Sequence, residues 1–199
     1  MKSHSQLRSS VLLACGQAAG RALRSSALWG AAGCLLLTAG CNLPSPQADT
    51  VRYFTLSNPV APTGDSATVR TVRLAGHLRG RTMAVRIAPH EVIYNEDVRW
   101  AEPLEDAITQ LLRARVGPTG AGHTITVQLS RCELVRAENN SVQLAATYTV
   151  TSAAGAVKHD AFTASPRTWD GQDHGTLVGL IRDAVNELGD ALAAAVGGK

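Results

Sequence analysis

The sequence predicts an α+β fold, a two-layer sandwich in which a mostly antiparallel mixed sheet carries two main helices on one face. Alternating apolar and polar residues recur between residues 124 and 150, as strands with one buried face require. Residues 101–116 and 175–196 instead carry apolar residues at helical spacing. Two amphipathic helices and an alternating sheet bury their apolar sides most simply against each other.

Short strands and loops fill the chain between residue 50 and the first helix. The expected elements are strands at 51–56, 68–74, 83–87 and 91–94, a loop at 58–66, and a turn or short helix at 75–81. The loop is rich in proline and glycine, and Pro89 separates the last two strands.

The first helix, residues 101–116, has clear start and stop signals. Pro103 suits a first turn, where a missing N–H costs little. Acidic residues gather at its start, whereas Arg113 and Arg115 lie at its end, as the helix dipole favours. Gly117 and the following proline end the helix.

Three strands and a long helix complete the domain. The strands are expected at 124–130, 142–150 and 156–164, with a turn at 138–141. The alternation changes phase near Arg131, which predicts a β-bulge. The last helix covers residues 175–196, and Asp170 or Asp173 is expected to cap its start.

The N-terminal segment has the layout of a bacterial export signal. Its only charges are basic (Lys2, Arg8, Arg21 and Arg24), and an uncharged, mostly apolar run follows at 27–40. This run is too short to cross a hydrocarbon core, which needs roughly 20 helical residues. The sequence Thr-Ala-Gly-Cys at 38–41 resembles a lipobox, in which the cysteine receives diacylglycerol and becomes the first residue.

The predicted organisation is therefore a signal peptide at 1–40, a lipidated Cys41 with a tether at 41–50, and a single α+β domain at 51–199. Asn42 follows the cysteine, and by resemblance to enterobacterial sorting this favours the inner, periplasmic leaflet of the outer membrane. Two alternatives are a plain secretory signal with an incidental cysteine and an uncleaved helical anchor.

Composition narrows the classes of partner. The leader holds four of the 19 Lys and Arg residues and none of the 16 Asp and Glu residues, so the mature chain is close to neutral. No basic surface is expected that would bind nucleic acid. Once Cys15 and Cys34 leave with the leader and Cys41 is lipidated, only Cys132 remains, and no intramolecular disulfide is possible.

No catalytic or metal-binding constellation stands out. His90-Glu91 begins like a zinc-protease motif, but Tyr94 occupies the position of the second histidine. Asp173 and His174 are adjacent, and a helix cap explains them more simply than a site. We therefore expect no enzyme activity, no metal and no cofactor other than the acyl modification.

The most specific internal signal is the segment 95–108, Asn-Glu-Asp-Val-Arg-Trp-Ala-Glu-Pro-Leu-Glu-Asp-Ala-Ile. It resembles the Trp-Ala-Glu-Pro-Leu segment of the PqiC-like, ABC-type transport auxiliary lipoproteins. The strand at 52–56 after the lipobox, the basic and apolar stretch at 72–86 and the C-terminal helix agree with that family. The stretch 74–80 departs from it, because the family's proline and tyrosine are missing there.

The resemblance implies an outer-membrane-anchored accessory to an MCE-domain transport system that moves phospholipid or related molecules between membranes. The partner would be the MCE-domain protein, which the lipoprotein docks while its acyl anchor holds the membrane. Two alternatives remain open: a periplasmic lipid carrier with its own apolar cavity, and a structural lipoprotein that aids envelope assembly.

Candidate partner-binding residues are Arg99, Trp100, Glu102 and Pro103, because Trp and Arg are enriched at binding hot spots. A structural interpretation competes with this one and is favoured. In it Trp100 packs as a hydrophobic staple beside a proline-initiated helix, and Arg99 pairs with Glu102. Trp169, beside the last helix, admits the same two interpretations.

Overall fold

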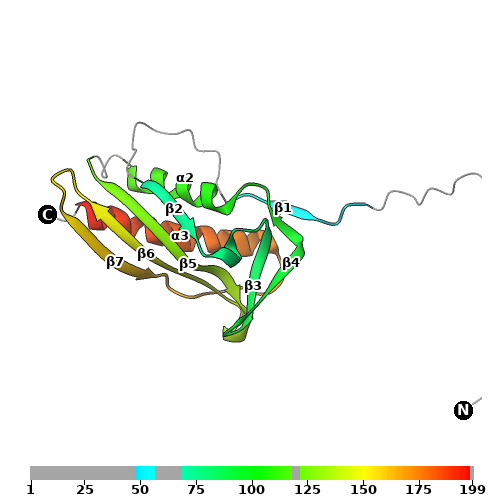
Figure 1. The fold of residues 1–199 in the computed structure, drawn as a ribbon. Helices are drawn as coiled ribbons and strands as arrows, with labels where there is room; N and C mark the ends of the chain where they lie inside the picture. The colour runs from blue at the N-terminus through cyan, green and yellow to red at the C-terminus, as the bar shows by residue number, and fades with distance from the viewer. Residues whose placement is uncertain (1–47, 57–68, 118–121, 198–199) are drawn as a thin grey trace, which may run out of the picture. The chain divides into compact units, whose positions relative to one another are not determined.

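The computed structural model describes residues 48–56, 69–117 and 122–197, which build one mixed sheet with two α-helices (Figure 1). The strands are β1 (Arg52–Phe54), β2 (Val69–Leu74), β3 (Thr82–Ala88), β4 (Glu91–Trp100), β5 (Thr124–Val135), β6 (Ser141–Thr151), β7 (Val157–Thr163) and β8 (Arg167–Thr168). The helices are α2 (Leu104–Val116) and α3 (His174–Gly197), and η1 (Gly76–Leu78) and η3 (Arg136–Glu138) are short 3-10 helices. The loop expected at 58–66 lies outside the described residues.

The strands follow the order β1-β4-β3-β5-β6-β7, with β2 paired to β5 and β8 paired to β6. Antiparallel pairs join β3 to β4, β5 to β6, β6 to β7 and β6 to β8. Parallel pairs join β1 to β4, β2 to β5 and β3 to β5. The predicted α+β fold with two helices packed on a mixed sheet is confirmed.

The core lies between the sheet and the two helices. Helix α2 packs on β2, helix α3 packs on β6, and the helices pack against each other. Val72, Ile108, Leu129, Leu144 and Leu188 are completely buried in this layer. Burying one such side chain stabilises a fold by about 1.5–3 kcal/mol, so this interface holds the domain together.

Strand β5 shows the predicted alternation and then departs from it. Ile125, Val127 and Leu129 are fully buried, and the residues between them are exposed. The register against β6 shifts between Leu129 and Arg131, which confirms the predicted bulge. Beyond the bulge the strand continues to Val135 with successive residues buried, because η1 and β3 cover the face that is open elsewhere.

Helix α2 begins later than the sequence indicated. Strand β4 continues through Trp100, so the helix starts at Leu104 rather than Ala101. Pro103 is the N-cap residue, with φ −57° and ψ 126°, and its missing N–H leaves no helical bond unmade. At the other end Gly117 adopts φ 53°, a conformation that glycine allows, and the helix ends there as predicted.

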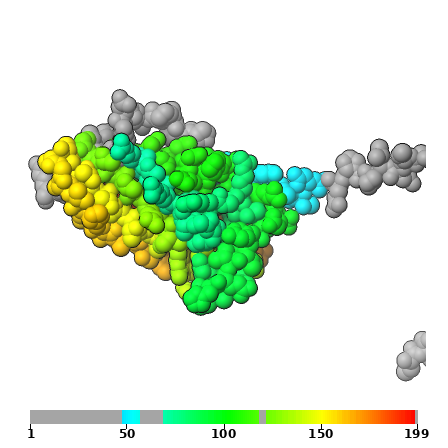
Figure 2. Space-filling view, viewed as in Figure 1, coloured from blue at the N-terminus to red at the C-terminus, as the bar shows by residue number. Residues whose placement is uncertain are grey.

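The β3–β4 hairpin and the end of β5 meet at one corner of the molecule, the lower lobe of Figure 2. A buried carboxylate on β5 is held by residues of η1 and β3. Glu133 on β5 is 1 % exposed. Its Oε1 accepts a hydrogen bond from Arg86 Nε at 2.6 Å, and its Oε2 lies 3.0 Å from His77 Nε2. A buried charge needs such partners, and they fasten η1 and β3 to β5. No pattern in the sequence indicated this cluster.

Candidate docking site

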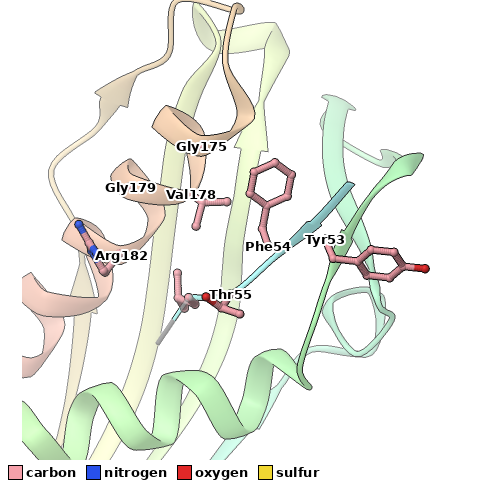
Figure 3. A pocket seen from close by; sticks show the side chains of 8 residues that line it. Tyr53, Phe54, Thr55, Gly175, Val178, Gly179 and Arg182 are labelled. Carbon is pink, nitrogen blue, oxygen red and sulfur yellow. The ribbon is translucent and has the colours of Figure 1, made fainter. Parts of the chain in front are cut away.

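A groove opens between β1 and the first turns of α3 (Figure 3). Its volume is about 390 Å³. Residues 53–56 line one wall, and Gly175, Val178, Gly179 and Arg182 line the other. The side chains of Phe54 and Val178 lie in the groove, whereas the side chain of Tyr53 points away from it. Tyr53 therefore borders the groove with its backbone.

The wall formed by β1 is an edge of the sheet that the described strands build. The N–H of Ala101 donates to the carbonyl of Phe54 at 2.8 Å, so the backbone polar groups of Phe54 are directed at β4. Successive residues of a strand direct these groups to opposite sides. Those of Tyr53 and Thr55 are consequently directed away from β4, where no other described strand pairs with β1.

The wall formed by α3 is held open by glycine. Gly175 and Gly179 are four residues apart and share one face of the helix. A methyl group added at Gly179 would meet no atom within 4 Å. Glycine inside a helix costs roughly 0.5–1 kcal/mol relative to alanine, so packing within the described residues does not account for Gly179. At Gly175 a methyl group would lie 2.7 Å from Asp173 Oδ2, so the side chain of Asp173 accounts for that glycine.

Arg182 lies at the next turn of α3 and is exposed to solvent. No carboxylate in the described ranges forms an ion pair with its guanidinium. The groove therefore ends beside an available positive charge.

Asp173 links β1 to the start of α3. Its Oδ2 accepts from the N–H of Thr176 at 3.0 Å, so Asp173 is the capping residue among the two that were predicted. Arg52 Nη2 lies 3.5 Å from Oδ1, and Trp169 Nε1 donates to the Asp173 carbonyl at 2.9 Å. Hydrogen bonds from the N–H groups of Thr176 and then Gly175 hold the pKa of Asp173 below its ordinary value.

His174 completes the connection between β1, β4 and α3. Its ring centroid lies 5.2 Å from that of Trp169 and 6.4 Å from that of Phe54, and its Nε2 lies 3.5 Å from Asn95 Nδ2. The guanidinium of Arg52 lies over the Phe54 ring, 5.0 Å from its centroid. These contacts fix the aromatic side chain that stands in the groove.

The residues predicted to bind a partner lie beside β1 rather than in the groove. Trp100 is 3 % exposed and pairs in register with Phe54. Pro103 caps α2, and its carbonyl accepts from the N–H groups of Asp106 at 3.0 Å and Ala107 at 3.1 Å. The burial of Trp100 and the place of Pro103 at the start of α2 agree with the structural interpretation of this segment.

Pro103 is exposed, and Arg99 is half-buried with 37 % of its side chain exposed. Its Nη2 lies 3.6 Å from the carboxylate of Glu96, and its Nε donates to the Glu96 carbonyl at 3.1 Å. The predicted pairing of Arg99 with Glu102 is therefore wrong, because the bulge in β4 brings Glu96 to Arg99. Glu102 is half-buried. Cys41, the predicted lipidation site, lies outside the described residues.

Sequence reasoning missed the groove. The available signal was the pair Gly175 and Gly179 inside a helical pattern, since a glycine within a helix often has a packing or functional reason. Spacing placed the two glycines on one face, but nothing in the sequence placed that face beside β1.

Comparison with known proteins identifies the family. The model of the family described as "ABC-type transport auxiliary lipoprotein component" matches residues 54–193, and the chain belongs to this family. The resemblance carried by the Trp100 segment is confirmed. The protein is thus an auxiliary lipoprotein component of ABC-type transport, a class that is anchored in the cell envelope.

Two solved structures share the fold. An uncharacterized protein aligns with a TM-score of 0.60 and 13 % identity, covering 72 % of this chain and 97 % of that chain. A protein of family DUF330 from Xanthomonas campestris aligns with a TM-score of 0.55 and 16 % identity, covering 63 % and 80 %. Identities this low concern the fold alone. No curated protein matches the sequence, and neither described helix is long and apolar enough to cross a membrane.

Proposed function

We propose that this chain is an outer-membrane-anchored accessory lipoprotein of an MCE-type ABC lipid transport system. It docks the periplasmic component of the transporter and so supports lipid traffic between the membranes and envelope integrity. The observation that carries the proposal is the family match across residues 54–193 behind a lipobox at 38–41. The Trp-Ala-Glu-Pro-Leu segment at 100–104 supports the same assignment.

In this proposal the domain acts as a tethered scaffold. Acyl chains on Cys41 hold the periplasmic leaflet of the outer membrane, and several chains on one residue anchor firmly. The segment from Cys41 to Arg52 reaches at most roughly 35–40 Å, because an extended chain gains about 3.3–3.6 Å per residue. Tethering at this range raises the effective concentration of the docking surface for the MCE-domain partner.

We infer a binding role rather than a catalytic one. The family is described as an auxiliary component, which supports this inference. The groove between β1 and α3 presents backbone polar groups, glycines and one guanidinium, which are groups that can bind a partner protein. No cofactor beyond the acyl modification enters the proposal.

The anchor is tested by mass spectrometry of the native N-terminus and by membrane fractionation, with Cys41→Ala as the control. We expect Cys41 as the first residue with acyl mass attached, and wild-type protein in the outer-membrane fraction. The variant should be released. An unmodified N-terminus on a protein that floats free would overturn the anchor.

Docking is tested by affinity capture of the tagged wild-type lipoprotein from intact envelopes. We expect an MCE-domain protein to be retained together with ABC transporter subunits. Purified, delipidated protein mixed with labelled phospholipid provides the second measurement, because stoichiometric co-elution would favour a lipid carrier instead. Capture without any MCE-domain protein would contradict the docking role.

A further inference from the structure

We propose that the groove between β1 and α3 receives an extended segment of the partner protein, which adds to the free edge of β1 as a further strand. This inference rests on the proposed docking function and names the surface that performs it. The segment carries small side chains where it faces the helix and an acidic group near Arg182.

The strand wall supplies the first reason. Tyr53 and Thr55 direct their backbone N–H and carbonyl groups away from β4, and no described strand satisfies them. An exposed row of such groups is a template for another strand, and peptides bind many domains by adding to it. Four consecutive residues of the chain border the groove, so an extended segment lies parallel to its long wall.

The helix wall supplies the second reason. Gly179 places bare backbone opposite β1, and the space around a methyl group added there is open for 4 Å. Glycine is used where another backbone must approach closely. The cost of a glycine inside α3 is then offset by the approach of the bound segment.

Charge supplies the third reason. Arg182 lines the groove and has no ion-pair partner within the described residues. Arg52, at the other end, already pairs with Asp173. An acidic side chain or a terminal carboxylate on the segment therefore finds its complement at Arg182 and not at Arg52.

A phospholipid acyl chain fits this groove less well than a peptide. Only Phe54, Leu56 and Val178 contribute apolar side chains, and the remaining lining is backbone, threonine and arginine. An acyl chain would leave the backbone groups of Tyr53 and Thr55 without hydrogen bonds in an apolar contact. A strand satisfies them.

The blocking experiment uses the anchored full-length lipoprotein and, as the probe, the MCE-domain protein that wild-type protein retains from envelopes. Gly179→Trp fills the open space of the groove, and Ala194→Trp places the same bulk on an exposed turn of α3 elsewhere. We expect Gly179→Trp to weaken binding of the probe roughly tenfold or more, with Ala194→Trp unchanged. Arg182→Glu should weaken it also, whereas Arg136→Glu, an exposed arginine on η3, should not.

Amide hydrogen exchange, followed by NMR, provides a measurement that does not depend on a variant. The N–H groups of Tyr53 and Thr55 should exchange freely in the isolated protein and become protected when the probe binds. If these N–H groups are already protected from exchange in the isolated protein at all concentrations, a segment of the same chain occupies the groove. Protection that grows with concentration means a second copy, and protection by phosphatidylethanolamine vesicles means lipid. Each of these three results overturns the proposal.

The two proposals fail in different ways. If wild-type protein retains no MCE-domain protein, the docking function falls and this inference falls with it. If wild-type protein and Gly179→Trp, both shown to be folded by matching thermal midpoints, retain it equally, docking stands and the groove is not its site.

Discussion

Gly179 and Gly189 lie on the same helix, α3, in opposite surroundings. A methyl group added at Gly189 would lie 2.7 Å from Arg115 Cγ and 2.9 Å from Arg115 Cβ, on helix α2. At Gly179 it would meet nothing within 4 Å. One half of the helix is packed closely against α2, and the other half borders an open groove. A glycine in a helix can thus allow close packing against another helix or leave an open groove, and only the surrounding residues show which of the two it does.

The charges follow the same division. In the packed half Asp190 accepts from Arg115 Nη2 at 2.9 Å, which joins the two helices. In the open half Arg182 has no such partner among the residues described. The guanidinium of Arg115 is therefore paired within the fold, whereas that of Arg182 is available to a partner.

The largest effect is expected from Trp100→Ala, which removes the core residue beside the groove. Trp100 is 3 % exposed, and truncating a buried aromatic side chain to alanine destabilises a fold by about 3–5 kcal/mol. Urea unfolding measures the loss. If the open end and the packed end of the molecule share one core, both halves should unfold together, in a single transition at a lower urea concentration than in wild type.

The matched control is Tyr53→Ala, on the neighbouring strand. Tyr53 is 54 % exposed and points away from the groove, so its loss should change stability by no more than about 0.5 kcal/mol. Unchanged stability in Trp100→Ala, with loss of the proposed binding to an MCE-domain protein, would instead make Trp100 an interface residue.

The packed core was largely predictable from sequence. The alternation through Ile125 and Leu129 and the bulge before Arg131 are local features, and local patterns predicted them. The local pattern also predicted a cap for the last helix but left it open between Asp170 and Asp173. Glu133 was not predictable, although it is the buried charge of the sheet. Its partners Arg86 and His77 come from distant segments, which the parallel pairings of β3 and of β2 with β5 bring close.

The candidate site was predictable only in part. The segment around Trp100 gave the family, since its residues carry a specific motif. It did not give the groove, because the groove depends on how far α3 stands from β1. That distance is set by the contacts of Asp173 and His174 with Arg52 and Phe54, which a linear pattern does not contain.

An intermediate effect is expected from replacing each glycine by alanine. Gly179→Ala should stabilise the protein by roughly 0.5–1 kcal/mol, because the helix gains and nothing is displaced. Gly189→Ala should destabilise it by about 1–2 kcal/mol net, because Arg115 and the α2–α3 contact must shift to admit the methyl group. Urea midpoints of the two variants measure both values. If both variants changed the stability of the protein in the same direction, the packed and open halves of α3 would not differ as described.

The smallest effect is expected on stability at acidic pH, and it involves one carboxylate at the start of α3 and one in its packed half. Hydrogen bonds to the Thr176 N–H and to the Arg115 side chain lower the pKa values of Asp173 and Asp190, respectively, below the ordinary 3.8. A lowered folded-state pKa gives stability that is present above the ordinary value and is lost as pH falls through the folded value. Asp173→Asn and Asp190→Asn should each flatten the fall in thermal midpoint below pH 4, and asparagine still caps α3.

Salt separates the two carboxylates. The first cause at Asp190 is a hydrogen bond from the exposed, charged side chain of Arg115, which 1 M NaCl weakens, whereas the first cause at Asp173 is a hydrogen bond from the uncharged backbone N–H of Thr176. In high salt the difference between wild type and Asp190→Asn should therefore shrink, and the difference for Asp173→Asn should remain. Thermal midpoints at pH 3 and pH 7, in low and high salt, measure this. Equal salt sensitivity of the two variants would show that the ion pair of Asp173 with Arg52, rather than the helix cap, stabilises the start of α3. The two ends of the helix would then depend equally on ion pairs.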